Sequence, residues 1–457
     1  MSDRSNPSRI IAKFIARLSY DDLTEQTRHA ARRSLLDALG VMLAASGLAE
    51  DVRPYGGFAA GETGPCRLIG SSARTSLSGA ALANGSLAHA LDFGDTFDAG
   101  PAHPNAALVP ALLAIADANP GIDARQFLTA MVAGSDLACR LSLAPARPYE
   151  EGGWYQPPLF NLIAGAAASA KLLGLTAGGI CAAMGLAMMQ GAFPAEIKYD
   201  AASPMRGVRE AFAARGAVEA ALLASAGARA FADPLGGQAG FFAVYGGGPP
   251  RPILLEGLGE RFLGDEVSFK PWPACRGTHA YIEAALALRD RIGGREIAFI
   301  EAEIGPVQTM LIEPLAAKAA PVSAIEARFS IPYTVAAALE DGAVTLDSFL
   351  PGKLADPAML ALARKVRPSF NAAWGRTEAA SGGLRIVLTD GASLEFAVTH
   401  AAGGLDRPLS DEALADKFVH CASKARTPVA PSRAKNFAAE LLAGHRSHPA
   451  EWLPASA

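Results

Sequence analysis

Cysteine, aromatic residues and excess basic charge are all scarce in this chain of 457 residues. The five cysteines are odd in number and have no CxxC spacing, which argues against a disulfide framework or a zinc knuckle and favours a reducing compartment. We therefore expect a cytoplasmic protein. The net charge of -4 offers no basic surface for nucleic acid. Residues 1–8 are polar and contain no apolar stretch of the kind found in secretory signals.

Long apolar runs are also rare. Residues 172–195 form an uncharged run that is long enough to span a membrane, but Ala, Gly and Met make up most of it. Gly178-Gly179 and Pro194 interrupt it. We expect a buried helix here and no membrane span.

What the chain does contain is apolar residues at helical spacing. Half of it is hydrophobic, with Ala, Gly and Leu prominent, which favours closely packed helices, and its length favours two domains. Helices are expected at 8–16, 24–45, 77–91, 105–118, 124–143, 159–173, 178–190, 209–226, 280–288, 332–339, 411–423 and 435–442. Thr24 and Ser410 are the expected N-caps of two of them.

The pattern changes near Ser268. Residues 297–304 alternate as a strand does, and residues 384–388 and 394–398 flank an Asp-Gly turn that indicates a hairpin. After Pro408 the pattern is helical again. The sequence thus predicts a mainly α protein in which a helical domain made from both ends of the chain accompanies a smaller α+β domain.

Groups that carry protons are concentrated between two of the predicted helices. Residues 89–103 contain two histidines, three carboxylates and a threonine: His89, Asp92, Asp95, Thr96, Asp98 and His103. Placing such groups between buried segments allows their pKa values to be tuned, which is what an enzyme of proton chemistry requires.

Four segments in the same order resemble the MmgE/PrpD family, which includes 2-methylcitrate dehydratase, cis-aconitate decarboxylase and iminodisuccinate epimerase. They are AARRSLLDALGV at 30–41, NGSLAHALDFGDT with HPNAALVPALLAIAD at 84–117, FKPWPACRGTH at 269–279, and EARFSIPY at 326–333. The resemblance implies a helical domain of 1–266 plus 402–457 and an α+β lid domain of 267–401. It also implies a homodimer that needs no metal or organic cofactor.

The resemblance places Asp92, Thr96 and His103 among the residues that line the active site. Dehydration, decarboxylation and epimerisation of small acids can share a carbanion next to a carboxylate, which needs a base and nearby cations or donors. His103 is suited to carry a proton near neutral pH, and Asp92 is suited to orient it or act on the substrate. The alternative is that Asp92 and Thr96 cap helices and that His103 is an ordinary loop residue.

His89 lies three residues before Asp92, so the two are expected on one helical face. A metal set of His89, Asp92, Asp95 and His103 is compatible with the spacing, but such pairs are common. We expect His89 to be a structural histidine and expect no metal.

The segment FKPWPACRGTH supplies three further candidates. Lys270, between Phe269 and Trp272, is expected to have a lowered pKa or to bind a substrate carboxylate; otherwise it is a lysine extending into solvent. For Cys275, a role in the site and a role as a small buried residue explain the sequence equally well. Arg276 is either a clamp for a substrate carboxylate or a solvated charge.

Three positions, in two segments, depart from the family pattern. Arg206 and Arg209 stand where the family has lysine and histidine, and Tyr155 stands where it has an active-site histidine. Arginine binds carboxylates but does not release its proton in a protein, and tyrosine is a poor base at neutral pH. Residues 144–158, which include Tyr155, are expected to form a mobile loop.

The first hypothesis for function is a cofactor-independent lyase of the dehydratase type that acts on a small di- or tricarboxylic acid. Its catalytic residues would be His103, Asp92, Lys270 and Tyr155, and Thr96, Arg206, Arg209, Cys275 and Arg276 would bind substrate. The alternatives are an epimerase or decarboxylase of a related acid, or a non-catalytic homologue that binds a carboxylate. All three assume that residues near 92–103, 206 and 270 share one cleft.

Overall fold

The computed structural model describes residues 6–200 and 203–453, which form two compact units. Unit 1 comprises residues up to Ala90, Gly94–Val267 and the chain from Ser410, and unit 2 comprises Leu91–Phe93 and Ser268–Leu409. The sequence-based bounds of a helical domain at 1–266 with 402–457 and of an α+β lid domain at 267–401 remain a prediction.

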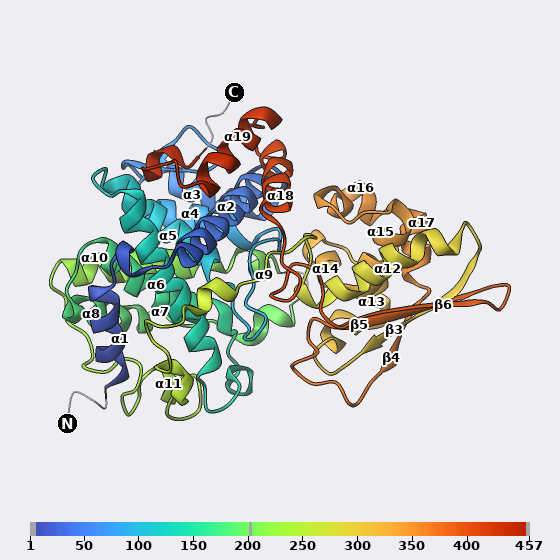
Figure 1. The fold of residues 1–457 in the computed structure, drawn as a ribbon, viewed down its shortest axis with the longest axis horizontal. Helices are drawn as coiled ribbons and strands as arrows, with labels where there is room; N and C mark the ends of the chain where they lie inside the picture. Colours follow the sequence, from blue (N-terminus) through green and yellow to red (C-terminus); the bar gives the residue numbers. More distant parts are fainter. Residues whose placement is uncertain (1–5, 201–202, 454–457) are drawn as a thin grey trace. The chain divides into compact units, whose positions relative to one another are not determined.

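Unit 1 is built almost entirely of helices (Figure 1). They are α1 (Pro7–Arg17), α2 (Glu25–Leu48), α3 (Arg53–Ala60), α4 (Leu77–His89), α5 (Asn105–Ala118), α6 (Ala124–Leu143), α7 (Gln156–Leu172), α8 (Ala177–Met188), α9 (Met205–Val208), α10 (Glu210–Ser225), α11 (Phe241–Val244), α18 (Asp411–Ser423) and α19 (Pro431–Leu442). A two-stranded antiparallel ribbon joins β1 (Cys66–Arg67) to β2 (Arg74–Thr75).

Small residues allow the central helices of unit 1 to approach closely. α10 packs against both α4 and α7. At Gly85 in α4, an added Cβ would lie 3.0 Å from the Cα atom of Ala211 and from the side chain of Ala214 in α10. The abundant alanine and glycine thus set the spacing of the helices that surround the site.

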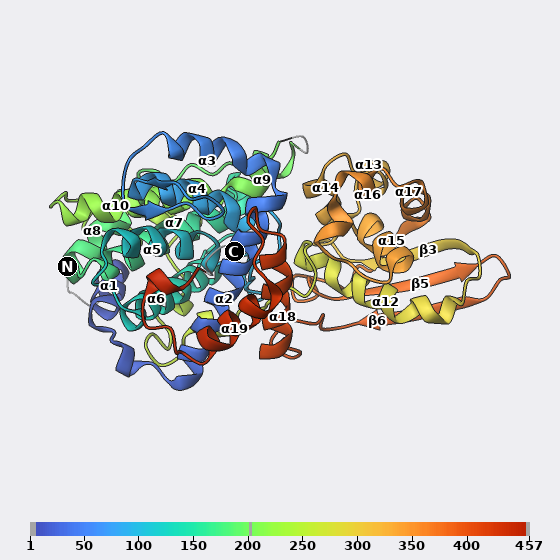
Figure 2. The ribbon, with the colours of Figure 1, turned by 90° about the horizontal axis from the view of Figure 1, so that it is seen from above.

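Unit 2 has a four-stranded sheet in the order β4-β3-β5-β6, made by β3 (Ile297–Ile304), β4 (Val366–Phe370), β5 (Gly382–Leu388) and β6 (Ser393–Val398). β3 pairs with β4 in parallel and with β5 antiparallel, and β5 and β6 form the antiparallel hairpin. Figure 2 shows α12 beside the sheet, where it packs against β5 and β6, and α15 packs against α12. The helices of this unit are α12 (His279–Ile292), α13 (Leu315–Ala319), α14 (Ala324–Arg328), α15 (Ile331–Asp341), α16 (Pro351–Leu354) and α17 (Pro357–Ala363).

The core of unit 2 lies between the sheet and its helices. Along β3, the side chains of Ile300, Ala302 and Ile304 are buried, and Glu301 and Glu303 alternate with them. α12 supplies Tyr281 among other buried residues, so a helix with one apolar face covers a strand with one apolar face.

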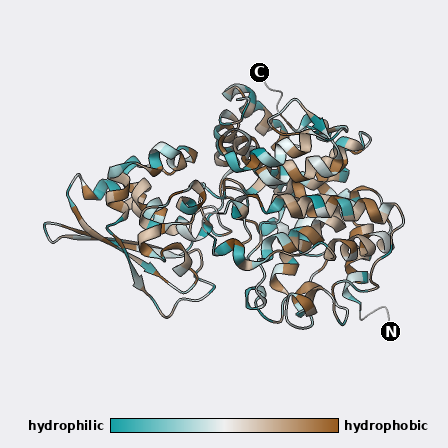
Figure 3. Cartoon of the chain, turned by 180° about the vertical axis from the view of Figure 1, so that it is seen from behind, coloured by the Kyte–Doolittle hydropathy of each residue, from teal (hydrophilic) through white to brown (hydrophobic). Residues whose placement is uncertain are grey.

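The fold class predicted from the sequence, mainly α with a smaller α+β part, is confirmed. The Thr24 side chain caps α2 by accepting from the Thr27 amide at 3.1 Å, and Ser410 caps α18 in the same way. In the uncharged run, α8 covers only Ala177–Met188. Within the described residues, no helix is both long and apolar enough to cross a membrane, and Figure 3 shows hydrophilic residues interspersed along the helices.

Candidate active site

Asp92 occupies a strained turn directly after α4. The helix ends at His89, and Asp92 has a φ of 47°. Within residues 6–200 and 203–453 it is the one residue other than glycine with positive φ. The expectation that His89 and Asp92 share a helical face is therefore wrong, and so is the alternative that Asp92 caps a helix. Such conformations persist where tertiary contacts enforce them, often at functional sites.

In unit 2, Lys270 supplies the contact that holds Asp92. Its Nζ atom donates to the Asp92 carbonyl oxygen at 2.8 Å and to carboxylate Oδ1 at 2.9 Å. Both side chains are almost fully buried. The surface alternative for Lys270 is therefore wrong, and its ammonium neutralises a carboxylate that would otherwise be costly to bury.

His279 and Arg328 are two further basic side chains close to this ion pair within unit 2. The pKa of His279 lies well below its usual value because the ring is buried and because Arg276 and Lys270 are nearby, so the imidazole is neutral. Its Nε2 atom lies 3.1 Å from the Ala274 carbonyl oxygen. Arg328, at the end of α14, was not among the residues predicted for the site, although it lies in the EARFSIPY segment; the Asp92 charge acts on its pKa.

Cys275 and Arg276 both precede α12. The backbone N–H of Cys275 donates to the Arg328 carbonyl oxygen at 2.9 Å, and Cys275 is partly exposed. The Arg276 guanidinium donates to the carbonyl oxygens of Ala402 at 2.6 Å and Ala401 at 3.0 Å. These bonds tie Arg276 to the backbone of residues 401–402.

In unit 1, His103 precedes α5 and is held by two backbone contacts. Its Nδ1 atom lies 2.8 Å from the Asp95 carbonyl oxygen. Since a carbonyl only accepts, Nδ1 carries a proton, and in the neutral form of the ring Nε2 is then the acceptor nitrogen. The Asn161 side chain in α7 donates to the His103 carbonyl oxygen at 3.0 Å.

The other polar residues of this loop differ in exposure. Asp95 is buried, and its Oδ2 accepts from the Asn105 amide at 2.7 Å. Burial and the charge of Asp37 raise the pKa of Asp95 to about 7. Thr96 is buried and Asp98 is exposed. The three carboxylates of the loop are therefore not equivalent, and Asp98 lies away from the buried set.

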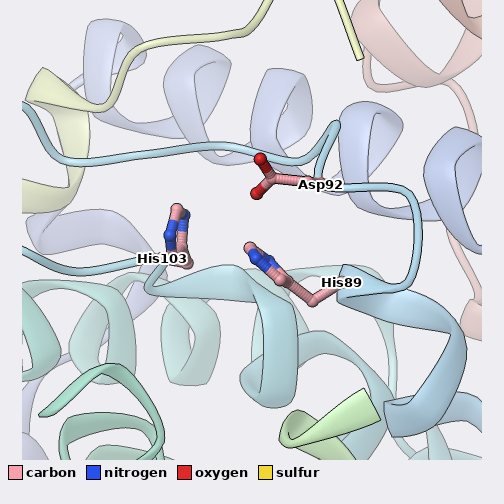
Figure 4. A group of neighbouring side chains, drawn as sticks. All are labelled: His89, Asp92 and His103. Atoms are coloured by element: carbon pink, nitrogen blue, oxygen red, sulfur yellow. The ribbon is translucent and has the colours of Figure 1, made fainter. Parts of the chain in front are cut away.

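Figure 4 shows His89, Asp92 and His103, and one possible ligand atom from each lies within 4.8 Å of the others. The rings of His89 and His103 have centroids 4.5 Å apart. His89, which we expected to be purely structural, thus lies against the proposed base. An oxygen of Asp92 already binds the Lys270 ammonium, which would repel a divalent cation. The chemistry of this donor set fits proton transfer better than metal binding.

The two departures from the family pattern are neighbours in unit 1. The Arg209 guanidinium lies over the Tyr155 ring at 4.9 Å, and its Nε is 3.3 Å from Oε1 of Glu210. Glu210 in turn accepts from Asn161 at 2.9 Å, the residue that also holds His103. Burial raises the pKa of Glu210 despite the opposing Arg209.

This buried network changes what Arg209 and Tyr155 can do. Arg209 also donates to the Arg206 carbonyl oxygen, so its charge is largely committed to the protein. Arg206 itself lies in α9 and is half-buried. Tyr155 is buried and immediately precedes α7, which begins at Gln156; the predicted mobile loop of residues 144–158 is thus partly helical.

Two family models match this chain in succession. The MmgE/PrpD N-terminal domain matches residues 9–253, and the MmgE/PrpD C-terminal domain matches residues 272–441. Together they cover most of the sequence and every residue of the predicted site except Lys270, which lies between the two matches.

Curated relatives are similar over most of their length. Cis-aconitate decarboxylase-like protein oryM of Aspergillus oryzae is 27% identical over 445 residues, which cover 92% of this chain and 91% of that protein. Cis-aconitate decarboxylase of Homo sapiens is 30% identical over 366 residues, covering 76% of this chain and 72% of the human protein. The Mus musculus enzyme of the same name is 27% identical over 430 residues, or 90% and 86% of the two chains. The chain therefore belongs to the MmgE/PrpD family, as its four motifs indicated.

Proposed function

We propose that this protein is a cofactor-independent lyase that acts on a small di- or tricarboxylic acid by proton transfer next to a carboxylate. The observation that supports it most strongly is the pair of preorganised groups: His103, with Nδ1 committed to Asp95, and Lys270, bound to Asp92. One group is an imidazole whose Nδ1 is oriented by a backbone carbonyl, and the other is a buried ammonium. They are the base and the cation that a carbanion mechanism requires.

Loss of carbon dioxide is the reaction we favour within this class, because the relatives are named cis-aconitate decarboxylases. In such a step the bond between the substrate carbon and its carboxylate breaks, and the electron pair remains on that carbon, stabilised by a neighbouring conjugated carboxylate. His103, after taking up a proton from solvent at Nε2, would then deliver that proton to the carbanion. Lys270 would hold the charge that develops on the remaining carboxylate, and Asp92 would keep Lys270 in place.

Loss of water, the first hypothesis from the sequence, uses the same groups in another order. His103 would remove a proton next to a carboxylate, and a donor would protonate the departing hydroxide. Tyr155 is the candidate donor that this hypothesis supplies. The Arg209 guanidinium lies over the Tyr155 ring, and the phenol hydroxyl is able to donate a hydrogen bond. In this hypothesis Thr96, Arg206, Arg209, Cys275 and Arg276 would orient the acid.

Epimerisation remains the second candidate, because Tyr155 and Arg209 stand where the family pattern has histidines. An epimerase only removes and returns one proton, and this chain has two fewer histidines than the family pattern at the site. A protein that binds a carboxylate without reaction is the remaining alternative.

NMR of cis-aconitate and of a panel of 2-hydroxy di- and tricarboxylates in D₂O tests the proposal. Carbon dioxide release supports decarboxylation, and an alkene product from a hydroxy acid supports dehydration. Deuterium incorporation without net conversion supports epimerisation. If no acid of the panel is converted or exchanged, the proposed function is wrong.

We also propose that this protein forms a homodimer, because it belongs to the MmgE/PrpD family. Light scattering in solution would then give twice the 47.1 kDa mass of one chain. A mass of one chain would contradict it. The cytoplasmic location and the independence from metals or organic cofactors likewise remain predictions.

A further inference from the structure

Arg328 is a buried cation that forms no ion pair among the described residues. It ends α14 in unit 2, and only 4% of it is exposed. Its Nε atom has no hydrogen-bond partner among the described residues, and no ion pair is formed by its guanidinium in that part of the chain. The one side-chain contact of note is with the Phe349 ring, whose centroid lies 4.7 Å away.

Other deeply buried arginines of this protein are paired. Arg140 donates to Asp136 at 2.7 Å, and Arg209 lies 3.3 Å from Glu210. Arg32 contacts Glu25 at 2.6 Å. A buried charge without such a partner is costly, and proteins keep one chiefly where a ligand supplies the missing charge.

The surroundings of Arg328 within unit 2 have an excess of positive charge. Lys270 and Arg328 are both buried beside Asp92, and Lys270 already neutralises that carboxylate. His279 is neutral because its pKa is lowered. Burial lowers the pKa of Arg328 to about 10, so the guanidinium still carries its proton at neutral pH.

The backbone connects Arg328 to the segment that carries Lys270. The Cys275 amide donates to the Arg328 carbonyl oxygen at 2.9 Å, which joins the end of α14 to residues 270–276. Lys270 and Arg328 therefore lie in the same unit, and a backbone hydrogen bond connects the segments that carry them. A guanidinium offers a planar fork that fits a carboxylate with two parallel hydrogen bonds.

We propose that Arg328 binds a second carboxylate of the substrate and thereby makes the protein selective for di- and tricarboxylic acids over monocarboxylic acids. The inference rests on the proposed function for the identity of the ligand as a substrate. It adds the residue that selects the number of carboxylates. Arg328 is a binding residue in this account and takes no part in proton transfer.

Succinate and butyrate test the proposal, because both have four carbons and differ in one carboxylate. Isothermal titration of the intact wild-type protein is expected to give tighter binding of succinate. Arg328→Met should weaken succinate on the order of 10- to 100-fold and leave butyrate unchanged. Arg328→Lys keeps the positive charge but loses the planar fork of the guanidinium, so its affinity for succinate should lie between those of wild type and Arg328→Met.

The melting temperature of the ligand-free protein separates binding from a structural role. Arg328→Met replaces an unpaired buried charge with an apolar chain of similar length, so the melting temperature should stay the same or rise. If Arg328 is instead needed to pack on Phe349, the melting temperature should fall, which would overturn the proposal. Arg385→Met is the control, because Arg385 lies on β5 in the same unit and already pairs with Glu301 at 3.0 Å. This variant should bind succinate as wild type does.

Two further results would overturn the inference: equal affinity of wild type for succinate and butyrate, or wild-type affinity for succinate in Arg328→Met. Neither ligand needs to react. Selective succinate binding that Arg328→Met abolishes, in a protein that converts no acid, would support this inference and refute the proposed lyase.

Discussion

The Nδ1 atom of His103 lies 2.8 Å from the backbone carbonyl oxygen of Asp95. This contact fixes which ring nitrogen carries the proton, since the carbonyl can only accept. In the proposed mechanism, Nε2 would be the nitrogen that takes or gives a proton. The two residues are eight positions apart, so the loop between α4 and α5 orients its own base.

Replacing His103 by Asn separates orientation from proton transfer. The Asn amide nitrogen can still donate to the Asp95 carbonyl, but the side chain is not a base. We expect kcat to fall about 10²- to 10⁴-fold, with little change in melting temperature. Steady-state kinetics and thermal unfolding measure the two effects. An Asn variant with more than a tenth of wild-type kcat would show that His103 is not the proton carrier.

The Lys270–Asp92 ion pair should stabilise the fold as a unit. Lys270→Met leaves a buried carboxylate without its cation and should lower the free energy of unfolding by about 3–5 kcal/mol. Lys270→Met with Asp92→Asn should recover part of this loss. Urea denaturation of the single and double variants gives the coupling energy. Additive effects of the two substitutions would contradict a direct interaction.

Asp95 should make stability depend on pH. Its pKa is raised to about 7 in the folded protein from 3.8, so the folded state binds more protons than the unfolded chain between about pH 4 and pH 7. The free energy of unfolding should therefore fall as pH rises through this window. Asp95→Asn keeps an acceptor for Asn105 and removes the charge, so the variant should match wild type near pH 4 and exceed it by on the order of 3 kcal/mol at pH 8.

Urea denaturation of both proteins at several pH values measures the difference. A difference between variant and wild type that is the same at pH 4 and pH 8 would show that Asp95 does not titrate in this range.

Tyr155 should act through its ring and its hydroxyl separately. Tyr155→Phe keeps the ring under the Arg209 guanidinium and should preserve stability, whereas Tyr155→Leu should lose about 0.5–2 kcal/mol. If the hydroxyl donates to the substrate, Tyr155→Phe should also lower kcat/KM roughly 10-fold. Equal stability of Phe and Leu variants would contradict the cation–π contact.

The sequence was most informative where local signals define an element. Residues 105–118, 124–143 and 411–423 are helices with the predicted bounds, because caps such as Ser410 and breaks such as Asn119-Pro120-Gly121 lie at their ends. The hairpin of β5 and β6 followed from Asp390-Gly391, where Gly391 has a φ of 88°. β4 was not predicted, because Pro368 and a largely exposed pattern hide an edge strand.

The site was less accessible to sequence reasoning wherever long-range contacts decide it. Asp92 lies beyond the end of α4, and its carbonyl and carboxylate are bound by Lys270, 178 residues further along the chain. The contact between Tyr155 and Arg209 joins positions that the sequence marked only as separate departures. Arg328 lies in the EARFSIPY segment, but its burial without an ion pair in the described part of the chain is a property that no spacing reveals.

Deuterium incorporation at the carbon next to the substrate carboxylate tests the central claim most directly. Wild type and His103→Asn would be compared by NMR in D₂O with the acid that the wild type converts. The account predicts incorporation by wild type, and a loss of at least about 100-fold in a variant that remains folded. Equal incorporation by both proteins would contradict His103 as the proton carrier and with it the mechanism proposed here.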